Sequence, residues 1–312
     1  MFGIGIDVGG TTIKFGLVNK KGEILYRLNF STPKLFSELV SLIIEGVNKL
    51  LDSANLSIDE IVGIGIACPG MISDDGVIIA SSNFEFENAP LKEELLKTFN
   101  TKIIIENDAN VATLAEKEYG VAKDYDNAIL LTLGTGVGGG IILNGKLFNG
   151  ANNSGVELGH FTLIYGGEKC GCGRKGCLEQ YASANALIRD AKKAMLNDKD
   201  SVVWKAVKNN LENLNAKIIF EEAKKGDKTA IKVVDKFIEY LSNGIMSLNN
   251  VYRPDVFIIG GGISAQGEYL TDKINQYCAK YYYGYKGIAS PKITTAILGN
   301  DAGIIGAFSL VK

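Results

Sequence analysis

The sequence has little net charge, few cysteines and no long apolar run, and these shortages exclude several classes of protein. Its 33 lysines and arginines nearly balance its 35 aspartates and glutamates, so the net charge of −2 gives no field that would attract nucleic acid or an acidic membrane. No apolar run approaches the roughly 20 residues that span a bilayer. No secretory signal precedes the first apolar strand pattern, which begins at Gly3. We expect a cytoplasmic globular protein without nucleic-acid or membrane partners.

Length and composition are those of an ordinary globular enzyme of two domains. A typical domain has about 100–200 residues, and this chain has 312. Hydrophobic residues make up 46% and charged residues 22%, with no low-complexity linker and no block of like charge. Glycine is abundant, with 37 residues, and its clusters follow apolar strand patterns. We therefore look for chemistry at the glycine clusters.

Apolar strand patterns alternate with helical patterns, which predicts an α/β fold with mixed sheets. The expected strands are 3–8, 15–18, 24–28, 61–67, 102–105, 127–133, 141–143 and 256–259. The expected helices are 35–51, 109–119, 182–196, 216–225, 230–252 and 302–310.

The opening of the chain recurs in its second half. A strand, a glycine turn, a second strand and a tight hairpin turn form a meander. A shift of 125 residues places Gly9 on Gly134 and Asn19 on Asn144, so both turns coincide. Such hairpins are common, but the agreement in order and spacing favours two copies of one module. The expected domains are 1–122, joined by the C-terminal helix at about 300–312, and 123–299.

Three glycine turns each follow an apolar strand, at Gly9–Thr12, Gly134–Gly140 and Gly260–Gly262. A turn without side chains exposes backbone N–H groups, which can bind phosphate oxygens. Glycine also serves turns simply through its freedom of dihedral angle, so one such turn is weak evidence. None has the Gly-Lys-Ser/Thr ending of a P-loop, and the third lacks the dinucleotide-binding spacing. Together the three suggest a nucleotide held between two similar domains.

Two aspartates stand at the ends of expected strands. Asp7 precedes the first glycine turn, where it could cap the turn or hold Mg²⁺ beside phosphates. Asp108 closes the polar run Glu106-Asn107-Asp108 and precedes an expected helix, where it could be an N-cap or a general base. In open α/β sheets, ligands bind at the carboxyl ends of the strands. The spacing alone leaves both alternatives open at each position.

One histidine and three cysteines form a complete ligand set for a structural zinc ion. His160, Cys170, Cys172 and Cys177 provide one imidazole and three thiols, and the glycines among the cysteines let that segment curl. A disulfide or three unrelated thiols are the alternatives, and the missing secretory signal argues against the disulfide. A metal here would fix the backbone near two further carboxylates, which could otherwise be plain surface groups: Glu157 and Glu179.

These motifs, taken in order, resemble the ROK family of repressors, open reading frames and kinases. The matching segments are Asp7-Val-Gly-Gly-Thr11, Gly134–Gly140, Glu157-Leu-Gly-His160 and Cys170-Gly-Cys-Gly-Arg-Lys-Gly-Cys-Leu-Glu179. The resemblance spans nearly the whole chain and implies two duplicated βββαβα-type domains of the sugar kinase, actin and heat-shock ATPase superfamily, with a central cleft.

The resemblance also implies roles for individual residues. Asp108 would be the catalytic base. The sugar would contact Asn83, Asn107, Asp108, Glu157, His160 and Glu179. The nucleotide and its Mg²⁺ would contact Asp7, Gly9, Gly10, Thr11, Thr12, Lys14, Gly134, Thr135, Gly136, Gly138, Gly260, Gly261 and Gly262. The zinc ligands would be His160, Cys170, Cys172 and Cys177.

The implied activity is ATP-dependent phosphorylation of a hexose, with the 6-hydroxyl of glucose as the first expectation. Phe86 stands where the glucokinase-like members commonly carry tryptophan, so N-acetylmannosamine, N-acetylglucosamine, fructose and allose stay open as acceptors. A sugar-binding regulator without turnover is the alternative from another class. Because the first strand is expected from Gly3, we expect no DNA-reading domain before it. The family further implies a homodimer or larger assembly.

Overall fold

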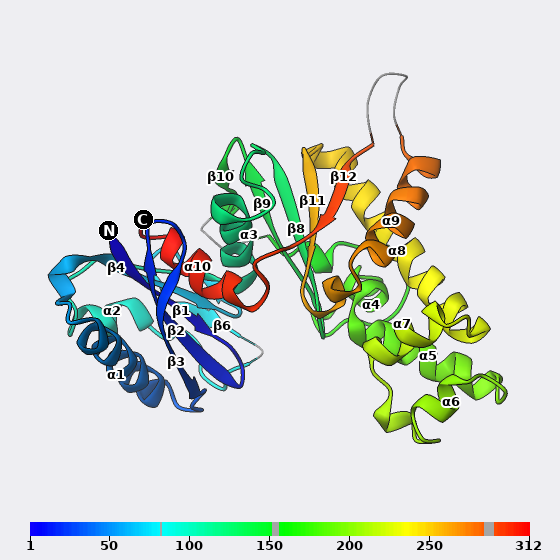
Figure 1. Cartoon of the computed structure of the whole chain (residues 1–312), viewed down its shortest axis with the longest axis horizontal. Helices are drawn as coiled ribbons and strands as arrows, with labels where there is room; N and C mark the ends of the chain where they lie inside the picture. The colour runs from blue at the N-terminus through cyan, green and yellow to red at the C-terminus, as the bar shows by residue number, and fades with distance from the viewer. Residues whose placement is uncertain (82, 152–155, 284–289) are drawn as a thin grey trace. The chain divides into compact units, whose positions relative to one another are not determined.

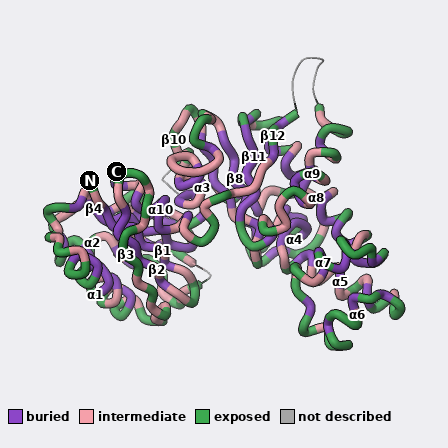
Figure 2. The backbone as a smooth tube through the Cα atoms, viewed as in Figure 1, coloured by how far each residue is buried: buried purple, intermediate pink, exposed green. Residues whose placement is uncertain are grey.

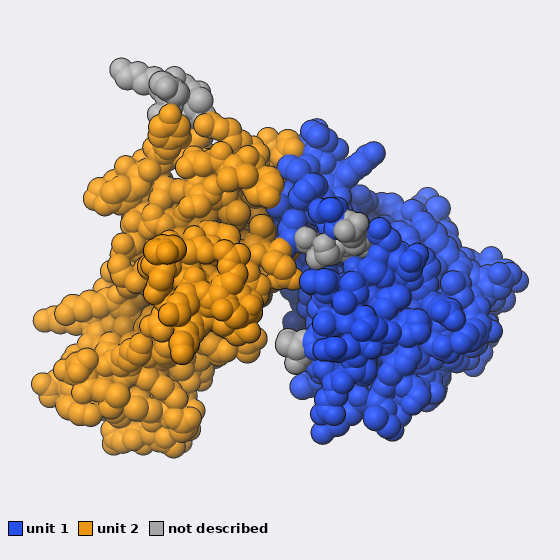
Figure 3. Space-filling model, turned by 180° about the vertical axis from the view of Figure 1, so that it is seen from behind, with its two compact units in different colours: residues 1–126, 140–156, 297–312 blue, residues 127–139, 157–296 orange. Residues whose placement is uncertain are grey.

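The computed structural model describes residues 1–81, 83–151, 156–283 and 290–312 (Figure 1). The chain divides into two compact units (Figure 3). Unit 1 comprises Met1–Asp126, Gly140–Val156 and Ile297–Lys312, and unit 2 comprises Asn127–Gly139 and Glu157–Ala296.

A five-stranded mixed sheet forms the centre of unit 1. In spatial order its strands are β3 (Ile24–Ser31), β2 (Thr12–Asn19), β1 (Phe2–Val8), β4 (Ile61–Cys68) and β7 (Ile103–Asn107). The first three are antiparallel neighbours, whereas β4 runs parallel to both β1 and β7. A small separate hairpin joins β5 (Met71–Ile72) to β6 (Ile78–Ala80).

Alternating residues of β1 bury opposite faces of this sheet. Ile4 and Ile6 belong to the core that includes α1 (Phe36–Ala54) and α2 (Leu91–Leu96). Gly5 faces the other way, towards the C-terminal helix α10 (Ala302–Ser309), which also contacts α3 (Asp108–Tyr119). A Cβ atom at Gly5 would lie 2.0 Å from the Ile304 carbonyl oxygen, so glycine is what lets this helix reach the sheet. Figure 2 shows β1 and β4 as mostly buried, whereas the edge strand β3 is exposed or intermediate along its length.

A second sheet repeats the strand order of the first. Its strands are β10 (Lys146–Leu147), β9 (Val137–Leu143), β8 (Ala128–Leu133), β11 (Val256–Gly260) and β12 (Lys292–Thr295). The first strand of each repeat, β1 or β8, is the central strand of its sheet. A later strand runs parallel to it, β4 in the first sheet and β11 in the second. The duplication predicted from the two glycine hairpins is therefore confirmed by topology.

The rest of unit 2 is mainly helical. Its helices are α4 (Glu179–Ala182), α5 (Ala184–Asn197), α6 (Val203–Ala206), α7 (Ala216–Lys224), α8 (Lys228–Tyr252) and α9 (Glu268–Tyr281). The long helix α8 contacts α4, α5, α7 and α9, and its buried stripe supplies much of their common core. Among the described residues, no helix is both long and apolar enough to cross a membrane.

Several sequence-based boundaries were wrong. The helix expected at 182–196 begins two residues later, at Ala184, because Ser183 is extended and caps α5 by accepting a hydrogen bond from the Ala186 amide. Ala182 instead ends the short helix α4. The strand expected at 141–143 begins earlier, at Val137, so Gly138 lies within a strand and not in the turn. Several short or polar elements were not predicted from the sequence: α2, α4, α6, α9, β5, β6, β10 and β12.

Candidate functional site

Polar side chains of unit 1 gather where three parallel strands end. In the strand register, Asp7 of β1 lies opposite Ala67 of β4, which lies opposite Glu106 of β7. Neighbouring strands are about 4.8 Å apart, so this edge presents several carboxylates within a small area. Cys68 lies on the middle strand. Burial, and then the nearby charges of Asp108 and Asp7, hold the pKa of its thiol well above the usual range.

Asp108 is the first residue of α3, and Asn107 is the residue that caps the helix. The Asn107 side-chain oxygen accepts hydrogen bonds from the amides of Ala109 (2.9 Å) and Asn110 (3.2 Å). Its Nδ2 donates to the Gly70 carbonyl at 3.0 Å. Helix 109–119 was expected with Asp108 before it; the helix instead includes Asp108, so the capping alternative for this residue was wrong. One Asp108 oxygen, Oδ1, accepts from the Ala109 amide at 2.8 Å.

Glu106, which was not among the predicted site residues, organises the same edge. Its side chain is 2% exposed. Oε1 accepts from the Asn107 amide (2.7 Å) and the Asn110 side chain (3.1 Å), and Oε2 accepts from the Asn149 side chain (2.7 Å). Its position in Glu-Asn-Asp at a strand end was the available signal, but its partner Asn149 lies 43 residues away.

The first glycine turn lies beside Asp7 and Asn83. The Gly9 amide donates to the Thr12 carbonyl at 3.0 Å, which closes the turn. The Lys14 ammonium pairs with the Asp7 carboxylate at 2.9 Å. A Cβ atom at Gly10 would lie 3.0 Å from Asn83 Nδ2, so the structure brings this predicted sugar ligand against the turn. Thr11, the other predicted member of the turn, accepts a hydrogen bond from the Thr32 amide through its carbonyl.

The other two glycine turns are neighbours within unit 2. The Gly134 amide donates to the Gly136 carbonyl at 3.0 Å, and Thr135 at the tip is exposed. Gly260 pairs in register with Thr132, one strand over. Gly261 has a φ of +75°, and a Cβ atom there would lie 2.6 Å from the Leu133 carbonyl oxygen, so only glycine fits. Gly262 follows and begins a short 3₁₀ helix.

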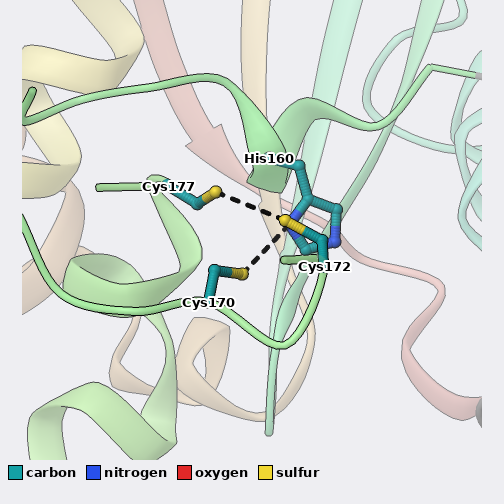
Figure 4. Close-up of side chains that lie close together, drawn as sticks. All are labelled: His160, Cys170, Cys172 and Cys177. Carbon is teal, nitrogen blue, oxygen red and sulfur yellow. Dashed lines mark hydrogen bonds between the residues drawn. The ribbon is translucent and has the colours of Figure 1, made fainter. Parts of the chain in front are cut away.

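The four predicted zinc ligands come together in unit 2 (Figure 4). The ligand atoms of His160, Cys170, Cys172 and Cys177 all lie within 4.8 Å of one another. Cys170 Sγ is 3.5 Å from His160 Nδ1, and Cys172 Sγ is 3.6 Å from Cys177 Sγ. Burial raises the pKa of the Cys177 thiol to about 12. The pKa of the exposed Cys172 is lowered, chiefly by a hydrogen bond from the Arg174 amide.

Glu179 joins this cluster to a glycine turn. Its Oε2 accepts from the Val137 amide at 3.1 Å, and its Oε1 lies 3.8 Å from Cys170 Sγ. Glu157 is exposed just before the 3₁₀ helix that carries His160. Gly159, between Glu157 and His160 in the sequence, packs on the backbone of Val137. A Cβ atom at Gly159 would lie 2.0 Å from the Val137 carbonyl oxygen. Glycine at this position is therefore required by packing.

The duplicated sheets and the glycine turn after the first strand of each define a protein of the sugar kinase, actin and heat-shock ATPase fold. The sequence profile of the ROK family matches residues 3–312, and the chain belongs to that family. Both the resemblance inferred from the motifs and the predicted α/β fold class are thereby confirmed.

Two curated relatives, each named glucokinase, are similar to the chain over nearly its whole length. The one from Thermotoga maritima is 36% identical over 318 residues, covering 99% of this chain and 96% of the relative. The one from Halalkalibacterium halodurans is 37% identical over 320 residues, covering 99% and 94%. The crystal structure of a ROK family glucokinase from Streptomyces griseus in complex with glucose and AMPPNP matches with a TM-score of 0.84, 31% identity and 99% coverage of both chains.

Proposed function

We propose that the chain is an ATP-dependent hexose kinase that transfers the γ-phosphoryl group to the 6-hydroxyl of glucose. The observation that carries this proposal is the full-length similarity to glucokinases, at 36% and 37% identity. It is supported by Asp108 at the carboxyl edge of a parallel sheet, where α/β proteins bind their ligands.

In the proposed reaction, Asp108 accepts the proton of the attacking sugar hydroxyl. Its carboxylate orients the hydroxyl for attack and takes up the proton that the hydroxyl loses. The amides of the glycine turns would receive the phosphate oxygens. When bound with ATP, Mg²⁺ would neutralise charge on those oxygens. Asp7 is the carboxylate available to it, held in place by Lys14.

We further propose that the sugar contacts Asn83, Asn107, Asp108, Glu157, His160 and Glu179. Asn107 has one Nδ2 hydrogen committed to the Gly70 carbonyl, which leaves the second for a hydroxyl. His160 would use one ring nitrogen for zinc and present the other to the sugar.

The cysteine and histidine cluster fits a structural zinc ion. At a Zn–S distance of about 2.3 Å, two ligands of a tetrahedral site lie about 3.8 Å apart. Two of the separations, 3.5 Å between Cys170 Sγ and His160 Nδ1 and 3.6 Å between Cys172 Sγ and Cys177 Sγ, are close to that value, and all four ligand atoms lie within 4.8 Å of one another. Elemental analysis of protein purified without chelator should find one zinc per chain; active protein free of bound metal would contradict this part of the proposal.

A coupled assay of ADP release tests the proposed activity. Glucose, N-acetylmannosamine, N-acetylglucosamine, fructose and allose are compared at equal concentrations, with a control lacking sugar. The proposal expects the largest kcat/KM with glucose. A larger value with another sugar would reassign the acceptor, and sugar binding without any ADP release would favour the regulator without turnover.

We also propose that the kinase is cytoplasmic and forms a homodimer or larger assembly, as the family resemblance implies. Sedimentation equilibrium of the purified chain tests the assembly, and a mass of a single chain at micromolar concentration would refute it.

A further inference from the structure

A cavity of about 260 Å³ lies in the helical part of unit 2, outside the proposed sugar and nucleotide contacts. Its walls come from α4, α5 and α8. Tyr181, Phe237 and Tyr240 provide aromatic surface, and the Tyr181 and Tyr240 rings lie 4.9 Å apart. Tyr181 and Phe237 are buried, so this surface belongs to the packed core. The cavity therefore offers apolar surface to a ligand about the size of one aromatic ring. Its volume is just below the range of typical ligand pockets, about 300–1,000 Å³.

The charges around the cavity favour an anion. Lys193, Lys232 and Lys236 line it, against a single carboxylate, Asp190. That carboxylate is already occupied, because Arg189 donates to both of its oxygens, at 2.8 and 3.1 Å. Of the three ammonium groups, Lys236 also pairs with Glu239, outside the lining, at 2.9 Å and lies 4.7 Å from the centre of the Tyr240 ring. Because that pair is partly exposed and hence weak, an anion in the cavity can compete for Lys236.

Two contacts connect the cavity to the zinc loop, which we define as residues 161–178. The Tyr181 hydroxyl accepts a hydrogen bond from the Glu168 amide at 2.7 Å. The Lys193 ammonium pairs with the Glu168 carboxylate at 3.6 Å. This pair is half exposed and hence weak, so an anion in the cavity could take Lys193 from Glu168 at little cost. Glu168 lies two residues before the expected zinc ligand Cys170.

We propose that this cavity is an effector site for a small anion with a planar apolar body, such as an aryl or enol phosphate or carboxylate. The ring lies on Tyr181 and Tyr240, and the acidic group pairs with the lysines. Binding draws Lys193 away from Glu168 and thereby changes the position of the zinc loop. The effect on turnover rests on the proposed kinase function; the binding site does not.

Calorimetric titration of the full zinc-loaded chain tests binding directly. Phenyl phosphate and benzoate are the probes. Inorganic phosphate, which lacks the ring, and benzyl alcohol, which lacks the charge, are the controls. We expect saturable binding of the probes, at least about tenfold tighter than either control, because benzyl alcohol lacks the charge that pairs with the lysines and inorganic phosphate lacks the ring that packs on the aromatic side chains. No saturable binding, or equal affinity for inorganic phosphate, would overturn the site.

Exposed lysines allow a variant that should fold normally. The double substitution Lys232→Gln with Lys236→Gln should weaken phenyl phosphate binding at least about tenfold. Lys228→Gln, on the same helix but outside the cavity, should leave it unchanged. If both variants lost the same affinity for phenyl phosphate, or if neither lost any, the probe would bind elsewhere.

The link to the zinc loop has its own readout. The substitution Lys193→Gln removes the ion pair with Glu168, as binding of the anion is proposed to do. It should therefore change the KM for the sugar by about fivefold, which is a typical allosteric coupling. In this variant, phenyl phosphate should cause no further change in that KM. An unchanged KM would refute the coupling. If the probes bind but no sugar is phosphorylated, the proposed function fails while the anion site stands.

Discussion

Asp108 can be tested as the general base without disturbing the helix that it begins. The helix cap is Asn107, whose side chain accepts from two amides, so the change Asp108→Asn leaves the cap intact. Loss of the base should lower kcat by roughly 10²–10⁴, with the KM for ATP little altered. Steady-state kinetics with the preferred sugar measure both.

The matched control for that change is Asp124→Asn, at an exposed aspartate in a turn of the same unit. It should keep full activity. If Asp108→Asn also kept kcat within about twofold of the unmodified chain, the role of general base would be refuted, since a general base contributes about 10²–10⁴.

Which side chains the sequence could predict depended on how far away their partners lie. The four thiol and imidazole ligands fall within 18 residues, so spacing alone was enough to group them, and the structure holds them within 4.8 Å. Glu106 and Glu116 were not predicted, because each also binds a partner far along the chain, such as Asn149 at 43 residues from Glu106. The Glu116 carboxylate accepts from the Ile297 and Leu298 amides, 181 and 182 residues away. No local pattern contains that information.

Glu116 connects helix α3 to two other segments of unit 1, the turn at Val121 and the segment Ile297–Leu298. Its side chain is fully buried and also accepts from the Val121 amide at 3.0 Å. Replacing it by alanine would remove the charged acceptor that three amides share, and a hydrogen bond to a charged group contributes about 1.5–3 kcal/mol. Glu116→Ala should therefore lower the free energy of unfolding by at least about 2 kcal/mol in urea titrations. Glu116→Gln should cost less, because one oxygen remains to accept.

The control on the same helix is Glu118→Ala. Glu118 makes a surface ion pair with Lys312, and such pairs contribute about 0–1 kcal/mol. If the two alanine variants lost equal stability, the buried carboxylate would have no special role in holding these segments.

The helices and strands that were missed are those whose identity comes from their neighbours. Strand β12 has only four residues, and its pairing with β11 decides its conformation. Helix α9 is polar and rich in tyrosine, and only a narrow stripe, including Leu270, Ile274 and Cys278, is buried. By contrast, the long helices α1 and α8 were predicted to within a few residues, because a broad apolar face repeats over several turns.

For the chain as a whole, the duplication gave the most reliable prediction. Two glycine hairpins 125 residues apart indicated one module used twice, and the two sheets share one strand order. The pattern could not reveal that Gly140–Val156 belongs to unit 1. That assignment depends on contacts such as the one between Glu106 and Asn149, which join distant segments.

The zinc ion should stabilise one part of the chain and not all of it. The ligands lie in unit 2, where backbone hydrogen bonds join 161–164 to 176–178: the Leu163 amide donates to the Gly176 carbonyl at 2.8 Å, and the Leu178 amide to the Phe161 carbonyl at 3.1 Å. These bonds belong to a loop with little regular structure, so we expect them to depend on the proposed zinc ion, which would hold both sides together. Chelation should therefore speed amide exchange at Leu163 and Leu178 at least about tenfold, as expected for local opening.

Hydrogen exchange followed by mass spectrometry resolves this outcome. Peptides from β1, β2 and β3 should exchange at unchanged rates, because their hydrogen bonds lie within unit 1. The variant Cys177→Ser should show the fast rates before chelator is added, whereas Cys278→Ser, at a buried cysteine outside the cluster, should respond to chelator as the unmodified chain does. Equal acceleration in the first sheet would mean that the metal stabilises the chain globally. No acceleration at Leu163 or Leu178 would mean that the loop holds without metal.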